Sequence, residues 1–238
     1  MRFYIVWFFY QVAYWLVRIV LFPVYSIKFE GRENRPKTAS AIFASNHRSY
    51  LDPVLVAMSA PYPFGYIAKE SLFKTPGFSH LIRFMGAFPA SSSKDPDYNM
   101  MDEAVRRLKG KCYMTIFPEG TRHTDGKVGK GKSGMCVLSA KSSVPIVPIG
   151  IIFNSNNLHF RSKILVRMGK PFYPEDYGLD ADSNPIQMKQ MKDDIMAEIK
   201  RLVEEDPPFE IIHDEPKRKS SRERAREARA KEKASKEN

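Results

Sequence analysis

The stretch that most constrains the fold of this 238-residue chain is a short apolar run followed by a polar loop and a helix signal. The run, Ala41-Ile42-Phe43-Ala44, has the length and composition of a buried strand. Asp52-Pro53 then predicts a helix start, with Asp52 as the cap and Pro53 in the first helical position. Further apolar runs alternate with helical patterns along the chain, which predicts an α/β domain.

The loop between this strand and this helix carries His47, in a position where catalytic groups often lie. Asp52 is close enough in sequence to fold back onto the ring. A histidine oriented by a carboxylate is the minimal apparatus for taking a proton from a hydroxyl. The alternative is that Asp52 only caps the helix and His47 is an ordinary loop residue, and the spacing taken alone favours that alternative.

A second apolar run, Cys112-Tyr113-Met114-Thr115-Ile116, leads into Phe117-Pro118-Glu119-Gly120-Thr121-Arg122. Gly120 allows a sharp turn or a close approach to a ligand. Arg122 offers a planar fork of donors suited to phosphate. Glu119 contacts hydroxyl groups of a substrate, braces the loop, or forms an internal ion pair with Arg122.

Together, N-H-x4-D and F-P-E-G-T-R resemble the glycerolipid acyltransferase family, the one containing 1-acyl-glycerol-3-phosphate acyltransferase. The order and separation of the motifs also match, and the resemblance covers about residues 27–169. It implies a mixed sheet flanked by helices, and acyl transfer from a thioester to a lipid hydroxyl that converts 1-acyl-glycerol 3-phosphate to phosphatidic acid. His47 would be the general base, Asp52 would hold its ring, and backbone N–H groups near Pro53 are candidates for stabilising the oxyanion.

The resemblance also implies substrate-binding residues. Glu119, Gly120, Thr121 and Arg122 form the matching loop. A family lysine that helps hold the acceptor phosphate corresponds to Lys69, at the end of a strand expected at 64–68. Lys74 is the second choice for that role, and a solvated strand end is an equally good account of Lys69.

One departure from the family concerns G-x-x-P-V-D-R, whose arginine faces the acceptor. Alignment of Gly86 and Pro89 places Ser92 at the arginine position. Arg83 and Lys94 are candidates for the missing charge. The departure leaves the exact acceptor open, so an acyltransferase for another lysolipid is the alternative.

Two later stretches have less specific patterns. The segment 127–134 lacks the spacing of a nucleotide-binding loop, and its Lys132 and Gly134 match family residues that precede a helix. In V-P-I-V-P-I-G, Pro145 and Pro148 argue against an ordinary central strand. This segment is expected to form an irregular apolar wall beside the acyl chain, or simply core.

Residues 1–26 are strongly apolar and contain both tryptophans of the chain. A secretory signal is disfavoured by the bulky aromatics and the missing cleavage site, and a spanning helix remains an alternative. Tyr4, Gln11, Arg18 and Tyr25 recur every seven residues and would draw a narrow polar stripe along a helix. This pattern favours an interfacial membrane-associated helix.

The formal charge of +11 predicts an anionic partner. No nucleic-acid-binding motif is present, so anionic membrane lipids are expected, with the catalytic domain on the cytoplasmic face. Cys112 and Cys136 lack metal-ligand spacing and are expected to be reduced core thiols, a disulfide being the alternative. No metal or cofactor is expected beyond an acyl donor, which is acyl-CoA or acyl carrier protein.

The predicted organisation is therefore a membrane-associated helix at 1–26, an α/β acyltransferase domain at 27–206 and a basic tail at 207–238. Residues 215–238 hold ten Lys/Arg against five Asp/Glu, with no large apolar residue, which predicts disorder or a lone solvated helix. A non-catalytic basic protein that binds membrane lipids is the alternative from another functional class, and the intact His47 and Asp52 argue against it.

Overall fold

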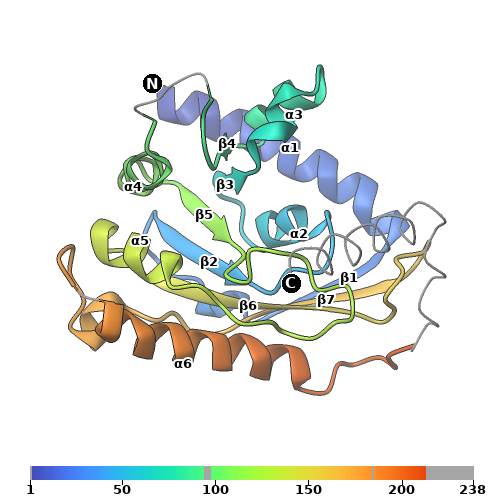
Figure 1. Cartoon of the computed structure of the whole chain (residues 1–238). Coiled ribbons are helices and arrows are strands. Elements are labelled where there is room, and N and C mark those ends of the chain that lie inside the picture. The colour runs from blue at the N-terminus through green and yellow to red at the C-terminus, as the bar shows by residue number, and fades with distance from the viewer. Residues whose placement is uncertain (1, 94–97, 184, 213–238) are drawn as a thin grey trace, which may run out of the picture.

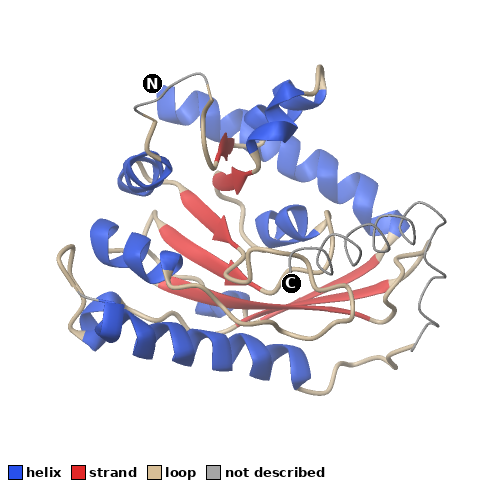
Figure 2. Ribbon diagram, viewed as in Figure 1, coloured by secondary structure: helices blue, strands red, loops and turns tan. Residues whose placement is uncertain are grey.

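The computed structural model describes residues 2–93, 98–183 and 185–212, and within them seven strands form one sheet (Figures 1 and 2). The strand order is β1-β7-β6-β2-β5-β3-β4, and every neighbouring pair is parallel except β6 and β7. The strands are β1 Ser26–Glu30, β2 Ala41–Ser45, β3 Phe64–Ala68, β4 Ala87–Pro89, β5 Tyr113–Ile116, β6 Ile146–Phe153 and β7 Lys163–Met168. The predicted mixed sheet flanked by helices is thus confirmed.

Helices cover both faces of this sheet (Figure 1). The helices on one face are α1 Arg2–Val24, α2 Asp52–Met58 and α3 Phe78–Phe84, and those on the other are α4 Met100–Lys109, α5 Gly134–Ser142 and α6 Pro185–Glu204. The two faces divide the core because neighbouring side chains of a strand point to opposite sides. In β2, Phe43 packs on the α2 side, whereas Ile42 and Ala44 pack on the α5 side.

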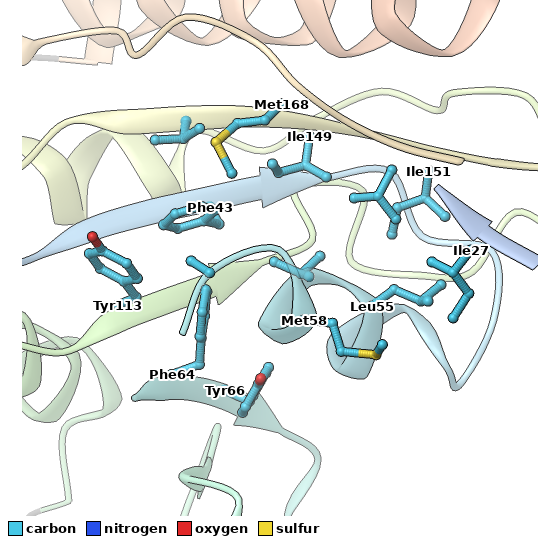
Figure 3. Packing of buried hydrophobic residues seen from close by; sticks show 14 of the residues in the cluster. Ile27, Phe43, Leu55, Met58, Phe64, Tyr66, Tyr113, Ile149, Ile151 and Met168 are labelled. Carbon is cyan, nitrogen blue, oxygen red and sulfur yellow. The ribbon is translucent and has the colours of Figure 1, made fainter. Parts of the chain in front are cut away.

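The core on the α2 side is built from large side chains of the central strands (Figure 3). Phe43 lies within 5.1 Å of the Phe64 ring and 5.0 Å of the Tyr113 ring, measured between centroids. Leu55 and Met58 of α2 close this layer and are at most 1% exposed (Figure 3). This packing fixes α2, and with it the loop that precedes α2.

The sequence-based expectation for the Pro145–Pro148 segment was wrong, because β6 is a regular, fully buried strand of eight residues. Pro148 is tolerated because β7 stops beside it. The Pro148 carbonyl accepts the N–H of Gly169 at 2.9 Å, and pairing with β7 begins only at Ile149. The N–H that proline lacks would point to the same side, into the interval between the last β6–β7 pair at Ile149 and the isolated bridge between Ile146 and Phe172, so the ladder is interrupted where the donor is missing.

Other predicted elements agree with the structure. Apolar residues at helical spacing form a buried stripe on α6; the stripe comprises Met188, Met191, Ile195, Ile199 and Leu202. Both cysteines are free thiols, and burial raises the pKa of Cys112 to about 11 and that of Cys136 to about 12. Helix α3 begins at Phe78, after Gly77 turns the chain with a φ of 73°.

In the N-terminal helix α1, Gln11 and Arg18 of the polar stripe are partly buried, and an apolar face is exposed. Gln11 donates to the Pro61 carbonyl at 2.8 Å, and Arg18 donates to the Tyr14 hydroxyl at 3.0 Å. The outward face is formed by Phe8, Val12, Trp15, Leu16, Ile19, Val20 and Phe22. Among the described residues, no helix combines the length and apolar character needed to cross a bilayer.

The chain leaves α6 and reaches Ile212, which forms an isolated bridge with Ser155. The expectation for the basic tail beyond this point lies outside the described residues. Its division from the domain at residue 207 therefore stays a prediction.

Candidate functional site

One edge of the sheet gathers nearly all the residues that the sequence singles out. Strands β2, β3, β5 and β6 run in the same direction and end at this edge, where β1 and β7 begin. His47 follows β2, Lys69 follows β3, and the loop with Arg122 follows β5. Crevices outside the carboxyl ends of strands are the usual ligand sites of open α/β sheets.

His47 and Asp52 form the pair expected from their spacing. The ring Nδ1 of His47 lies 2.7 Å from Oδ2 of Asp52, whose side chain is completely buried. The His47 side chain is 19% exposed, so its ring is only partly open to solvent. Because Nδ1 is engaged, Nε2 is the ring nitrogen left to exchange a proton with a bound molecule.

The same carboxylate oxygen organises the whole loop. Asp52 Oδ2 also accepts the backbone N–H of Arg48 at 2.6 Å and that of Ser49 at 2.7 Å. The expectation that Asp52 is an N-cap was wrong, since the helix begins at Asp52 itself and Leu51 occupies the cap position. Asp52 is thus a residue of the first turn whose side chain reaches back toward His47.

The backbone donors near the start of α2 are already used. The N–H groups of Arg48 and Ser49 bind Asp52, that of Leu51 binds Ser49 Oγ, and that of Asp52 points to the Ser49 carbonyl. Pro53 has no N–H to offer. These four N–H groups are therefore engaged within the protein, and the expectation that backbone donors near this helix start stabilise an oxyanion stays a prediction.

The loop after β5 lies directly on His47. The Phe117 ring stacks on the imidazole, with 4.1 Å between centroids and an interplanar angle of 20°. The His123 N–H donates to the His47 carbonyl at 2.7 Å. The two sequence motifs, separated by some seventy positions, therefore form one site.

Glu119 lies beneath this loop with a fully buried side chain. Neither carboxylate oxygen forms a hydrogen bond within the described part of the chain, and the closest cationic partner is His123 Nε2 at 3.6 Å. Burial raises the pKa of Glu119, although His123 and the nearby backbone of Gly129 and His47 act in the opposite direction. In this position Glu119 is a buried acid below the loop rather than a surface contact.

Arg122 does not pair with Glu119, so the alternative of an internal ion pair between them was wrong. Its guanidinium lies 3.7 Å above the Tyr50 ring centroid and donates to the Tyr50 hydroxyl at 2.9 Å. Both side chains are exposed. Glu119 and Arg122 point to different sides of the loop because Gly120, with a φ of 72°, reverses the backbone between them.

A cleft of about 500 Å³ lies beside the His47 loop. Its polar and charged lining comes from the loops after β2, β5 and β6, and its apolar lining includes the junction between α1 and β1. The lining residues are Tyr25, Arg48, Ser49, Tyr50, Leu51, Arg122, Thr124, Phe153, Asn156, Asn157 and Leu158. His47 does not line the cleft but immediately precedes four residues that do.

Sequence reasoning missed Arg48 and Tyr50, which occupy variable positions between the fixed residues of N-H-x4-D. Arg48 is only 9% exposed, and its Nη2 donates to Asn156 Oδ1 at 3.0 Å. The guanidinium also lies 4.9 Å above the Phe153 ring centroid. Burial lowers the pKa of Arg48, with Asp52 and Asp125 acting in the opposite direction. The signal available in the sequence was an arginine directly after His47, inside the histidine motif.

The remaining predicted residues stand apart from Arg122. Lys69 is exposed at the end of β3, two strands from β2, and does not line the cleft. Lys74 lies 3.8 Å from the Glu70 carboxylate. The structure thus places Lys69 at the same edge of the sheet as Arg122 without bringing the two side chains into contact.

The segment around Ser92 is held by a carboxylate rather than by an arginine. Glu70 accepts hydrogen bonds from the Ser93 N–H at 2.8 Å and from the Ser93 hydroxyl. Arg83, one candidate for the missing charge, stacks on Phe73 at 4.8 Å. Lys94, the other candidate, lies outside the described residues.

Lys132 precedes α5, as its family match suggests, and it packs against the β5 loop. Its N–H donates to the Pro118 carbonyl at 2.9 Å, and a Cβ added to Gly120 would lie 3.2 Å from its Nζ. The absence of a side chain at Gly120 thus lets a second cation approach the loop that carries Arg122.

The fold and the site define an α/β protein that holds a histidine–carboxylate pair at the carboxyl edge of an open mixed sheet, next to a cationic cleft. A family model described as Acyltransferase matches residues 26–152, more than half of the chain. The chain belongs to this acyltransferase family.

Individual relatives agree with this assignment. The chain is 34% identical over 137 residues to "1-acyl-sn-glycerol-3-phosphate acyltransferase LPAT1, chloroplastic" from Arabidopsis thaliana, covering 56% of this chain and 38% of that protein. It is 27% identical over 164 residues to "1-acyl-sn-glycerol-3-phosphate acyltransferase" from Borreliella burgdorferi, covering 68% and 62%. The chain therefore spans between two fifths and two thirds of these relatives' lengths.

The fold is also similar to a solved structure. The crystal structure of "the 1-acyl-sn-glycerophosphate (LPA) acyltransferase, PlsC, from Thermotoga maritima" superimposes with a TM-score of 0.62 at 25% sequence identity. The match covers 85% of this chain and 78% of that chain.

Proposed function

We propose that the chain transfers an acyl group from an acyl thioester to the sn-2 hydroxyl of 1-acyl-glycerol 3-phosphate, giving phosphatidic acid. The observation that carries the proposal is the 2.7 Å contact between His47 Nδ1 and the buried Asp52 carboxylate. The printed names of the relatives support the same reaction. In this reading Asp52 keeps Nδ1 protonated and leaves Nε2 as the proton acceptor.

The reaction proceeds by direct attack. As the acceptor hydroxyl oxygen forms a bond to the thioester carbonyl carbon, its proton passes to His47 Nε2. The carbonyl electron pair moves to oxygen, then returns and expels the thiolate, which takes the proton from the imidazolium. The products are an ester and a free thiol, so no serine or cysteine nucleophile takes part.

Buried Asp52 supports the transient imidazolium in two ways. Its negative charge lies against Nδ1, and its position is fixed by the N–H groups of Arg48 and Ser49. The stacked Phe117 ring limits rotation of the imidazole. A base that is already oriented avoids the cost of reorganisation during the reaction.

The acyl donor in this proposal is acyl-CoA or acyl carrier protein, and no further cofactor takes part. Arg122, exposed beside the histidine loop, contributes to binding the acceptor phosphate. Lys69 remains a candidate for the same role from the far side of the β5 loop.

We place the protein on the cytoplasmic face of a membrane, with anionic lipids as partners. The outward face of α1 supports this, because seven large apolar side chains are exposed there while Gln11 and Arg18 face inward. A monomeric soluble protein seldom exposes a continuous apolar surface of this kind. The formal charge of +11 adds attraction to anionic headgroups.

The test is an assay with the purified full chain in mixed micelles. Labelled acyl-CoA and acyl carrier protein would each be offered with a panel of lysolipids, and products identified by mass. Phosphatidic acid should form from lysophosphatidic acid with at least one donor. Preference for an acceptor without a phosphomonoester would show that another lysolipid is the substrate. This outcome is worth testing because Ser92 stands where the family arginine faces the acceptor. Binding without any turnover would overturn the proposal.

A further inference from the structure

The cleft beside the histidine loop contains a buried arginine whose charge is not matched by a carboxylate. Among the described residues, Arg48 forms no ion pair, although its side chain is almost completely buried. Its Nη2 binds the neutral oxygen of Asn156, and its buried Nε has no hydrogen-bond partner within the described chain. Asp52 and Asp125 act on its charge without forming an ion pair with it, and buried charges in proteins are usually paired, so the guanidinium keeps the capacity to bind an anion.

The surroundings hold the guanidinium facing the cleft. The guanidinium carbon lies 4.9 Å above the Phe153 ring centroid, and the Gly126 backbone is close to Nη2, since a Cβ added there would be 3.1 Å from it. Gly126 has a φ of 83°, which lets the loop pass this close. Because Arg48 lines the cleft, a ligand in the cleft can bind its guanidinium.

The cleft has two chemically different sides. Arg48 and Arg122 supply positive charge, and Asn156 and Thr124 add polar groups. Tyr25 and Leu158 give an apolar side next to the end of α1. A molecule that matches both sides is an amphiphile with an anionic head, such as a lysolipid phosphomonoester.

We infer that Arg48 is a specificity-determining residue that binds the acceptor phosphate together with Arg122. Since it rests on the proposed function, this inference says which side chains select the acceptor. It also accounts for Ser92, because the positive charge missing at that position is supplied from the opposite side of the β5 loop. The inference requires that an acceptor held by Arg48 reach His47, the residue before it, with its glycerol hydroxyl.

The experiment compares Michaelis constants for lysophosphatidic acid and for the acyl donor in the full chain. Arg48→Gln should raise the constant for lysophosphatidic acid by about 10–100-fold, because a charge-assisted hydrogen bond is lost. The Michaelis constant for the donor and the turnover at saturating substrate should stay within about twofold of wild type, which is clearly smaller than the expected change in the acceptor constant. Arg106→Gln is the matched control, since it removes an exposed guanidinium on α4 away from the cleft.

A second variant avoids any loss of packing. Asn156→Asp places a carboxylate against the Arg48 guanidinium, at an exposed position that does not endanger folding. The new ion pair should compete with the phosphate and raise the acceptor constant without lowering the melting temperature. Glycerol 3-phosphate should inhibit wild type competitively against lysophosphatidic acid and inhibit both variants much less.

Three results would overturn the inference. An unchanged acceptor constant in both variants would exclude Arg48 from the phosphate site. A rise in the donor constant alone would assign the cleft to the donor. If turnover and melting temperature both fell while the acceptor constant did not rise more than the donor constant, Arg48 would have a structural role only. If wild type does not acylate lysophosphatidic acid, the proposed function fails separately, and the cleft is still tested by the thermal shift of wild type and Arg48→Gln with glycerol 3-phosphate.

Discussion

Two substitutions of Asp52 should separate its role in folding from its role in chemistry. Asp52 Oδ2 accepts the N–H of Arg48, which is buried, and that of Ser49, which is partly buried. Asp52→Ala leaves both donors without their partner. An orphaned buried donor costs about 1–3 kcal/mol, and the Ser49 donor costs less because water can reach it. The expected loss is therefore about 2–4 kcal/mol in the free energy of unfolding.

Asp52→Asn keeps an oxygen in the same place. Its amide oxygen can still accept both N–H groups, though each hydrogen bond loses the strengthening that a charge provides. The stability loss should be about 1–2 kcal/mol, roughly half of that for alanine. The imidazolium support is lost in both variants, so turnover should fall by roughly 10²–10⁴-fold in each.

The assay pairs thermal unfolding with steady-state turnover. For a chain of this size, about 1 kcal/mol corresponds to a change of roughly 2–4 °C in melting temperature. Alanine should therefore lower the melting temperature by about 5–15 °C and asparagine by clearly less. If Asp52→Asn retains near-normal turnover, the carboxylate does not support His47. If the melting temperature of Asp52→Asn falls as far as that of Asp52→Ala, the hydrogen bonds from Arg48 and Ser49 do not account for the loss of stability.

Four further outcomes are expected. His47→Ala should lose roughly 10²–10⁴-fold in turnover with an unchanged melting temperature, and near-normal turnover in that variant would refute the general-base role. Replacing Leu16 and Ile19 together by glutamate should reduce flotation with liposomes without loosening the fold, since both side chains are exposed; undiminished flotation would contradict membrane contact through α1. Arg122→Ala should raise the Michaelis constant for lysophosphatidic acid by about 10–100-fold. If only the Michaelis constant for the acyl donor rises, Arg122 does not bind the acceptor phosphate. Because burial raises the pKa of Glu119, the folded state loses stability as the pH rises above the ordinary carboxyl pKa, and Glu119→Gln should gain stability relative to wild type at pH 7 but not at pH 4. Urea unfolding at both pH values tests this, and an equal difference at the two would refute it.

The strands and helices that apolar runs define were predictable because packing follows the same periodicity. The β2 run is buried on both faces, and the α6 stripe packs against the sheet. Pro148 was misjudged because the rule against proline applies to a missing hydrogen bond, and the sequence does not reveal that β7 ends beside it. A local rule failed there because a long-range pairing decided the outcome.

The candidate site was predictable where chemistry depends on spacing. His47 and Asp52 are five positions apart, and their contact needs only one turn of chain. Partners supplied by other strands were not predictable. The stack of Arg122 on Tyr50 and the bond from Arg48 to Asn156 join residues 72 and 108 positions apart. Those contacts depend on strand order, which no local pattern specifies.

The reversed direction of β1 and β7 has a consequence for how the N-terminal helix meets the site. Only Tyr25 separates α1 from β1, and the Arg161 N–H ties the end of α1 to the β6–β7 loop at 2.6 Å. Had β1 run the same way as β2, α1 would end at the opposite edge of the sheet, roughly 16 Å away for a five-residue strand. As it is, the helix ends at the rim of the cleft. A lipid lying along the apolar face of α1 would therefore have its headgroup at the cleft next to the His47 loop. It would not have to leave the membrane surface to reach the site.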